Sequence, residues 1–218
     1  MKELTNYRRA VQYLQKVFNL VNAEYFNNEL PEVTLTVQES TGSYAHVSIS
    51  NTWFTVDGKG MKELNISACY LTRPIEEVVA SLIHECSHIY NMEHGIKDCS
   101  GYYHNRRFKE TAENLGKLRI EKHEKYGWTI TYPTEDTINF CIENGLEDIK
   151  IGRQSAFSFG GFSGGTQGNG TKTIKPTSPK KRSGYYRWIC PCCGTIIRST
   201  KENINIQCGD CNERFILA

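Results

Sequence analysis

No stretch of this 218-residue sequence is long and apolar enough to cross a membrane, since no run of 18 apolar residues occurs. The first seven residues are not followed by the apolar segment of a secretory signal peptide. We therefore expect a cytoplasmic protein that has no membrane partner. The length allows one sizeable domain and a small second module.

A strong net charge is also lacking, because the chain carries only +2 at neutral pH. The charge is unevenly distributed, however. Residues 1–152 hold 16 Lys and Arg against 21 Asp and Glu, a balance of −5, and residues 153–218 hold 10 against 3, a balance of +7. This asymmetry favours a polyanion as the partner of the C-terminal part, and a merely solubilising tail is the alternative.

An HExxH motif occupies residues 84–88 and is preceded by a helical pattern. His84 and His88 are four residues apart, so both imidazoles lie on one helix face and can bind one metal ion. Glu85 can then take a proton from water at that metal, which predicts zinc-dependent hydrolysis, most simply of a peptide bond. The buried face of the helix is predicted to carry Ile75, Val78, Val79, Leu82, Ile83, Cys86, Ile89 and Tyr90.

A catalytic zinc needs a third protein ligand, and the sequence offers several candidates. His94 lies ten residues after the first motif histidine, but the class of peptidase with that spacing has a methionine turn downstream, and no methionine follows residue 92. His104 begins another periodic segment, which predicts a histidine in the first turn of a second helix running to about residue 118. Glu110 or Glu113 on that helix is a further alternative.

The remaining patterns of residues 1–152 indicate an α+β domain, in which helices accompany a small, mostly antiparallel sheet. A helix is predicted over 5–28, where apolar residues recur every three or four positions, and Thr72 is expected to cap the motif helix. Residues 127–151 are expected to pack as a small extension of the domain. Strands are predicted over 33–37, 44–50 and 53–56, and a turn at 57–60 leads to a strand over 63–68 that pairs back.

Residues 153–184 differ sharply in composition from the rest of the chain. They are rich in Gly and Ser and then in basic residues and Pro, so they cannot bury enough surface to form a core. We predict a flexible linker over this range. Its cations are candidates for contacts with phosphate groups: Lys172, Lys175, Lys180, Lys181 and Arg182.

Two CxxC pairs separated by 14 residues predict a zinc ribbon over residues 185–218. Its ligands are Cys190, Cys193, Cys208 and Cys211, and Cys192 is a spare thiol. Four thiolates close the coordination sphere, so this zinc is structural, and so small a module needs it to fold. With the histidine site, the chain is predicted to bind two zinc ions.

Aromatic and cationic residues alternate around the first cysteine pair. Such a mixture can stack on bases and pair with phosphates, which predicts contact with nucleic acid. The alternative is that the aromatic residues form the small core of the ribbon. The candidate contact residues are Tyr186, Arg187, Trp188, Arg198 and Lys201.

Several stretches of the chain resemble the SprT-like (Spartan-related) zinc metallopeptidase family. They are YFNNELP at 25–31, NIS at 65–67, PIEE at 74–77, HECSH at 84–88 and YHNRRFK at 103–109. The resemblance extends over residues 4–132 and resumes at 185–218. It implies a zincin-like fold for residues 1–152 and places the third zinc ligand at His104. Eukaryotic members cut proteins covalently trapped on DNA, so protein substrates, DNA (single-stranded DNA included) and a role in DNA repair are also implied.

The sequence thus predicts a zinc metalloendopeptidase that a C-terminal zinc ribbon guides to DNA-associated proteins. Glu85 would be the general base and then carry the proton to the leaving amine. The competing hypothesis is a nucleic-acid-binding or regulatory zinc protein with a weakly active or inactive zincin domain. The presence of Glu85 favours the enzyme, because metal binding alone does not need this carboxylate.

Overall fold

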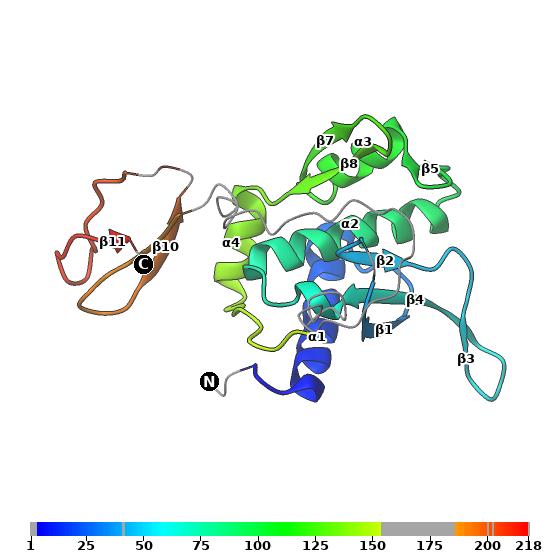
Figure 1. The fold of residues 1–218 in the computed structure, drawn as a ribbon, viewed down its shortest axis with the longest axis horizontal. Helices are drawn as coiled ribbons and strands as arrows, with labels where there is room; N and C mark the ends of the chain where they lie inside the picture. The colour runs from blue at the N-terminus through cyan, green and yellow to red at the C-terminus, as the bar shows by residue number, and fades with distance from the viewer. Residues whose placement is uncertain (1–3, 41, 154–185, 200, 202, 218) are drawn as a thin grey trace, which may run out of the picture. The chain divides into compact units, whose positions relative to one another are not determined.

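The structure is a computed structural model that describes residues 4–40, 42–153, 186–199, 201 and 203–217 (Figure 1). The chain divides into two compact units, Met1–Phe162 and Ser163–Ala218. Within the described ranges, four α-helices and several small sheets give an α+β architecture. No helix among these residues is long and apolar enough to cross a membrane. Apart from Arg153, the predicted linker lies outside the described residues.

Helix α1 (Tyr7–Phe26) is shorter at both ends than the predicted helix over 5–28. It begins after Asn6, whose side chain accepts hydrogen bonds from the Arg8 and Arg9 backbone N–H groups. It ends where Asn27 adopts a left-handed conformation, with φ of 50°. The face that enters the core carries Ala10, Leu14, Val17, Phe18, Val21, Tyr25 and Phe26.

The first sheet has the order β1-β4-β2, and β3 pairs with the start of β4. Its strands are β1 (Val33–Gln38), β2 (Ala45–Val47), β3 (Trp53–Phe54) and β4 (Gly60–Ser67). The β3–β4 hairpin forms around the predicted turn. The longest pairing, β1 with β4, is parallel, whereas a mostly antiparallel sheet was predicted. The sequence could not distinguish the two arrangements, because side chains alternate with period two in both.

Helix α2 (Ile75–Glu93) carries the HExxH motif and lies between the first sheet and the layer formed by α3 and β8 (Figure 1). The short 3₁₀ helix η1 (Ala68–Tyr70) precedes it. The prediction that Thr72 caps α2 is wrong. The capping position belongs to Pro74, and the Ile75 N–H instead donates to Asp148 Oδ1 at 2.9 Å. A carboxylate 73 residues away therefore satisfies the helix start.

The second sheet has the order β5-β6-β8-β7 and packs against α3 (Arg106–Asn114), whereas α4 (Glu135–Glu143) packs against α2. Its strands are β5 (Cys99–Ser100), β6 (Tyr103–His104), β7 (Arg119–His123) and β8 (Gly127–Tyr132). His104 lies in β6 and not in the first turn of α3, whose cap is Asn105. In β8, Gly127 pairs with His104 at φ of +71°, and a Cβ there would meet the His104 carbonyl.

The C-terminal unit contains one antiparallel sheet of order β10-β9-β11 within the described residues. Its strands are β9 (Tyr186–Ile189), β10 (Ile196–Ser199) and β11 (Ile216–Leu217). Trp188, Cys190, Cys208 and Phe215 form its small core. Each cysteine pair is followed by a residue with positive φ, Gly194 at +74° and Asn212 at +56°, which turns the backbone back toward the sheet.

Candidate metal centre

The side chains of His84, His88 and His104 converge on one point. His104 Nε2 lies 3.3 Å from His84 Nε2 and 3.1 Å from His88 Nε2. Two of these side chains come from successive turns of α2, and the third comes from β6 of the second sheet. His104 lies 16 positions after His88, so the fold brings together groups that sequence spacing alone could not pair.

Each of these three rings has an acceptor for the proton on its other nitrogen. Nδ1 of His84 lies 2.7 Å from Thr131 Oγ1, and Nδ1 of His88 lies 2.7 Å from Asp98 Oδ2. Nδ1 of His104 lies 3.3 Å from the Tyr102 carbonyl oxygen. Because a neutral imidazole carries one N–H, these contacts leave the three Nε2 lone pairs facing one another.

The apolar surroundings of the rings favour the neutral forms of His84 and His104. Phe108, fully buried on α3, stacks on His88 with ring centroids 4.4 Å apart and contacts His84 at the same separation. Burial lowers the pKa of His104 to about 4, and burial followed by the neighbouring histidines lowers the pKa of His84 well below its usual value. Neutral imidazole is the form that binds metal.

Glu85 lies on α2 beside the histidines and is only 7% exposed. Burial raises the pKa of its carboxyl group to about 7. The neighbouring His88 and a hydrogen bond from the Val47 backbone act in the opposite direction and lower the pKa, but burial has the larger effect. Val47 is in β2, so the first sheet holds this carboxyl group from the side opposite the second sheet. A carboxyl group with a pKa near neutrality is suited to accept and release a proton.

The alternative third ligands lie away from this cluster. His94 follows the last turn of α2, where its ring stacks on Tyr90 and its Nε2 is 3.2 Å from Glu29. Glu110 pairs with Arg106 on the surface of α3. Glu113 accepts from the Ile120 N–H and lies near Lys109. The geometry therefore groups His104, and none of these alternatives, with the motif histidines.

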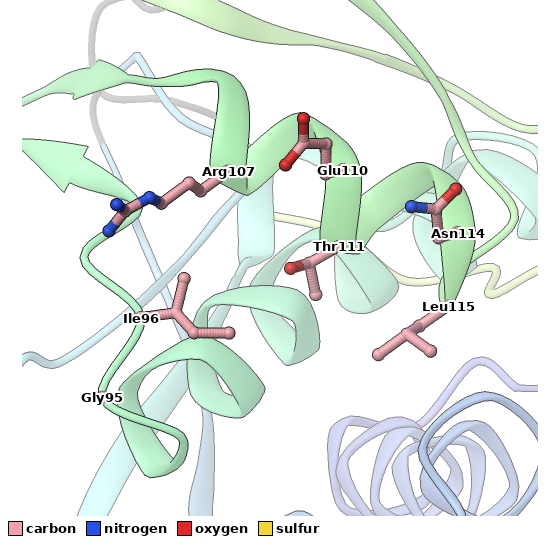
Figure 2. Close-up of a pocket in the computed structure, with 7 residues that line it drawn as sticks. All are labelled: Gly95, Ile96, Arg107, Glu110, Thr111, Asn114 and Leu115. Atoms are coloured by element: carbon pink, nitrogen blue, oxygen red, sulfur yellow. The ribbon is translucent and has the colours of Figure 1, made fainter.

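A separate open pocket of about 490 Å³ lies beside α3 and is drawn in Figure 2. Its apolar floor includes Ile96 and Leu115, and Arg107, Glu110 and Asn114 stand at its polar rim. None of the three clustered histidines lines it. Thr111 lines this pocket, and its hydroxyl group donates a hydrogen bond to Asn91. Asn91 in turn donates to Asp98, the partner of His88.

The sequence patterns did not reveal the groups that orient the histidines. Asp98 lies in the segment between α2 and β5, and Thr131 lies in β8. Burial raises the pKa of Asp98, but hydrogen bonds from His88, Asn91 and Cys99 outweigh it, so the pKa falls below its usual value. Asp98 is therefore an ionised carboxylate that accepts a hydrogen bond from His88 Nδ1. Neither position has a motif, and only the folded chain places them.

In the C-terminal unit, the thiols of Cys190, Cys193, Cys208 and Cys211 lie within 4.8 Å of one another. The Cys193 and Cys208 sulfur atoms are 3.6 Å apart. Hydrogen bonds from the Thr195 side chain and backbone lower the pKa of the exposed Cys193 thiol to about 6. Four converging thiols of this kind could hold one metal ion.

The proposed nucleic-acid contacts of this unit lie on two opposite sides of its sheet. Arg187 and Arg198 are direct partners in the β9–β10 register, so their side chains share one face. Tyr186 and Trp188 belong to the other face and pack in the core, where Trp188 is 8% exposed. The prediction that Trp188 stacks on a base is therefore not supported by its burial, and the core alternative describes it. Lys201 is exposed.

The five cations predicted to contact phosphate (Lys172, Lys175, Lys180, Lys181 and Arg182) lie outside the described residues.

The sequence model of the SprT-like family matches residues 14–131, which is 118 of the 218 residues. The chain belongs to the SprT-like family. The SprT-like segment contains all three converging histidines, Glu85 and the orienting groups Asp98 and Thr131. Searches of curated proteins and of solved structures gave no significant match.

Proposed function

We propose that the chain is a zinc-dependent metallopeptidase with a zincin-like catalytic domain. The observation that carries the proposal is the convergence of three imidazole nitrogens beside a buried carboxyl group of raised pKa. Family membership supports the same conclusion, because the matched segment contains this whole arrangement. A centre with three protein ligands leaves one coordination position open, as catalytic zinc sites do.

The spacing of the ligand atoms fits zinc. A tetrahedral ion bound at the usual length of about 2.0–2.1 Å places its ligand nitrogens about 3.3 Å apart. The two Nε2 separations that involve His104, 3.3 and 3.1 Å, agree with this value. The orienting partners on all three Nδ1 atoms are of the kind that zinc-binding histidines have.

In the proposed reaction, zinc held by His84, His88 and His104 would act as a Lewis acid that polarises the peptide carbonyl and lowers the pKa of water. The carboxylate of Glu85 takes the proton of the attacking water and then delivers it to the leaving amine. A base with a pKa near 7 can do both. The Val47 backbone keeps the carboxylate in place between the two transfers.

We expect two metal ions per chain, because the histidine cluster and the cysteine cluster are separate groups of ligands in separate units. Metal analysis of protein purified without chelators should give two zinc ions per chain. Cys208→Ser should remove the ion of the C-terminal unit and leave the other. A wild-type ratio that stays near one after reconstitution with zinc would show that one cluster does not bind metal.

We further propose that the C-terminal unit is a zinc ribbon that binds DNA and so directs proteolysis to DNA-associated proteins. The support is electrostatic. Residues 153–218 carry a balance of +7, and Arg187 and Arg198 are neighbours on the face of the sheet opposite its core. A pair of guanidinium groups on one face can bind two phosphates. The aromatic residues of the unit stabilise its core in this proposal.

Replacing both Arg187 and Arg198 with alanine should weaken binding to single-stranded DNA and make it less dependent on salt. If each arginine neutralises one phosphate, the slope of log K against log salt should become less steep by about 1.4. Fluorescence anisotropy across a salt series measures both quantities. Arg119→Ala, an exposed cation of the other unit, is the control that should leave them unchanged. Equal slopes for the double variant and the wild type would exclude this face.

A further inference from the structure

Asp98 is the centre of a buried group of hydrogen bonds next to the metal centre. Its side-chain oxygen Oδ2 lies 2.7 Å from His88 Nδ1 and accepts from Asn91 Nδ2 at 3.0 Å. Cys99 is a third donor to this carboxylate. Asp98 is 7% exposed and Asn91 is completely buried, so water does not compete for these bonds. The His88 ring therefore has one favoured orientation.

The hydrogen bonds continue from Asn91 to helix α3. The Thr111 hydroxyl group donates to Asn91 Oδ1 at 2.7 Å, and Thr111 lines the floor of the pocket in Figure 2. The Asp98 carboxylate only accepts hydrogen bonds, so the Asn91 NH₂ group faces Asp98 and the Asn91 oxygen faces the Thr111 hydroxyl group, which donates to it. Without the hydroxyl group, the buried Asn91 oxygen would lose its donor, and the amide would be held less firmly against the Asp98 carboxylate.

The backbone of Asp98 is hydrogen-bonded to the residue that follows the third ligand, His104. The Asp98 carbonyl accepts from the Asn105 N–H at 2.9 Å, one residue after His104. Asn105 Nδ2 in turn donates to the Lys97 carbonyl at 2.8 Å. The segment at 97–98 thus holds His88 through a side chain and the His104 region through the backbone, which sets the separation between these two ligands.

We propose that Asp98, Asn91 and Thr111 are positioning residues that align His88 with His104 and thereby set the metal affinity of the histidine site. This inference rests on the proposed function, because it assumes that the histidines bind a metal. Partners of metal-bound histidines typically change affinity by about 10–100-fold when they are removed. Asp98 contacts the ligand directly, and Thr111 acts through two intervening side chains.

The test uses Co²⁺ as a spectroscopic probe on the full chain. Co²⁺ at the cysteine cluster gives intense thiolate charge-transfer bands, and Co²⁺ at the histidine cluster gives only weak visible bands, so the two sites are read separately. Affinity for the histidine site is measured by competition with a chelator. The variants are Asp98→Ala, Thr111→Val, which keeps the shape but not the hydroxyl group, and Thr111→Ser, which keeps the hydroxyl group. Glu110→Gln, on the adjacent surface of α3, is the control.

We expect about a 10–100-fold weaker affinity for Asp98→Ala and a smaller loss, within about tenfold, for Thr111→Val. Thr111→Ser should restore most of that loss, and both Thr111 variants should keep their melting temperature in the metal-free form within a few degrees of each other. The visible bands of the histidine site should shift in Asp98→Ala and Thr111→Val only. Wild-type affinity and spectrum in both variants would overturn the inference. A wild-type chain that binds Co²⁺ only at its cysteines would instead overturn the proposed function, and the inference with it.

Discussion

Replacing Glu85 with glutamine is expected to lower the rate of proteolysis by roughly 10²–10⁴-fold, the usual contribution of a positioned general base. Glutamine has nearly the same shape, and its oxygen can still accept the Val47 hydrogen bond, but it cannot take a proton from water. Metal content should stay at the wild-type level, because Glu85 is not among the grouped ligands. Self-cleavage and cleavage of a DNA-bound protein, with zinc and single-stranded DNA present, measure the rate.

Glu93→Gln makes the same chemical change on the same helix and is the matched control. Glu93 pairs with Lys62 at the far end of α2, so its replacement should leave the rate unchanged. Equal rates for Glu85→Gln and the wild type would show that another group is the base. If the wild type itself cleaves neither substrate, with zinc confirmed at the histidines, the chain is a nucleic-acid-binding or regulatory protein and not a peptidase.

Replacing His104 with alanine should remove the metal ion of the histidine site. In structural zinc sites, an apparent binding free energy of about 10–16 kcal/mol is divided among four ligands, which is about 3 kcal/mol or at least a hundredfold in affinity for each. Zinc per chain should therefore fall from two to one after dialysis against a weak chelator. The residual ion should be the one bound by the cysteines.

His94→Ala is the companion variant, because it tests the other spacing that the sequence allowed. The His94 ring stacks on Tyr90 and points to Glu29, so its loss should leave two zinc ions per chain. The reverse pattern, loss of metal in His94→Ala and retention in His104→Ala, would show that the ligand assignment is wrong.

The parts of the fold that depend on local periodicity could be predicted from the sequence. Helix α2 and its buried face follow from the three-to-four spacing of apolar residues, and the pair His84 and His88 follows from the geometry of one helical turn. The grouping of the four cysteines follows from the spacing of the two CxxC pairs. In each case the interacting residues are close in sequence, or the motif itself fixes their spacing.

The parts that depend on contacts between distant elements could not be predicted in this way. The orienting groups Asp98 and Thr131 come from the α2–β5 segment and from β8 and carry no motif. The start of α2 is satisfied by Asp148 and not by a neighbouring residue. In the C-terminal unit, the pairing of β9 with β10 brings Arg198 to the face of Arg187, opposite the aromatic residues of β9, and a composition count could not reveal this.

Gly127 shows that a residue with no functional group can be as important to the proposed metal site as one of its histidines. Its backbone lies against the His104 carbonyl in a conformation that side chains rarely adopt, and no space exists there for even a methyl group. Any substitution must therefore displace the strand that carries His104. In a screen for loss of function, position 127 would score like a catalytic residue, and the cause would be backbone geometry one strand away from the reacting groups.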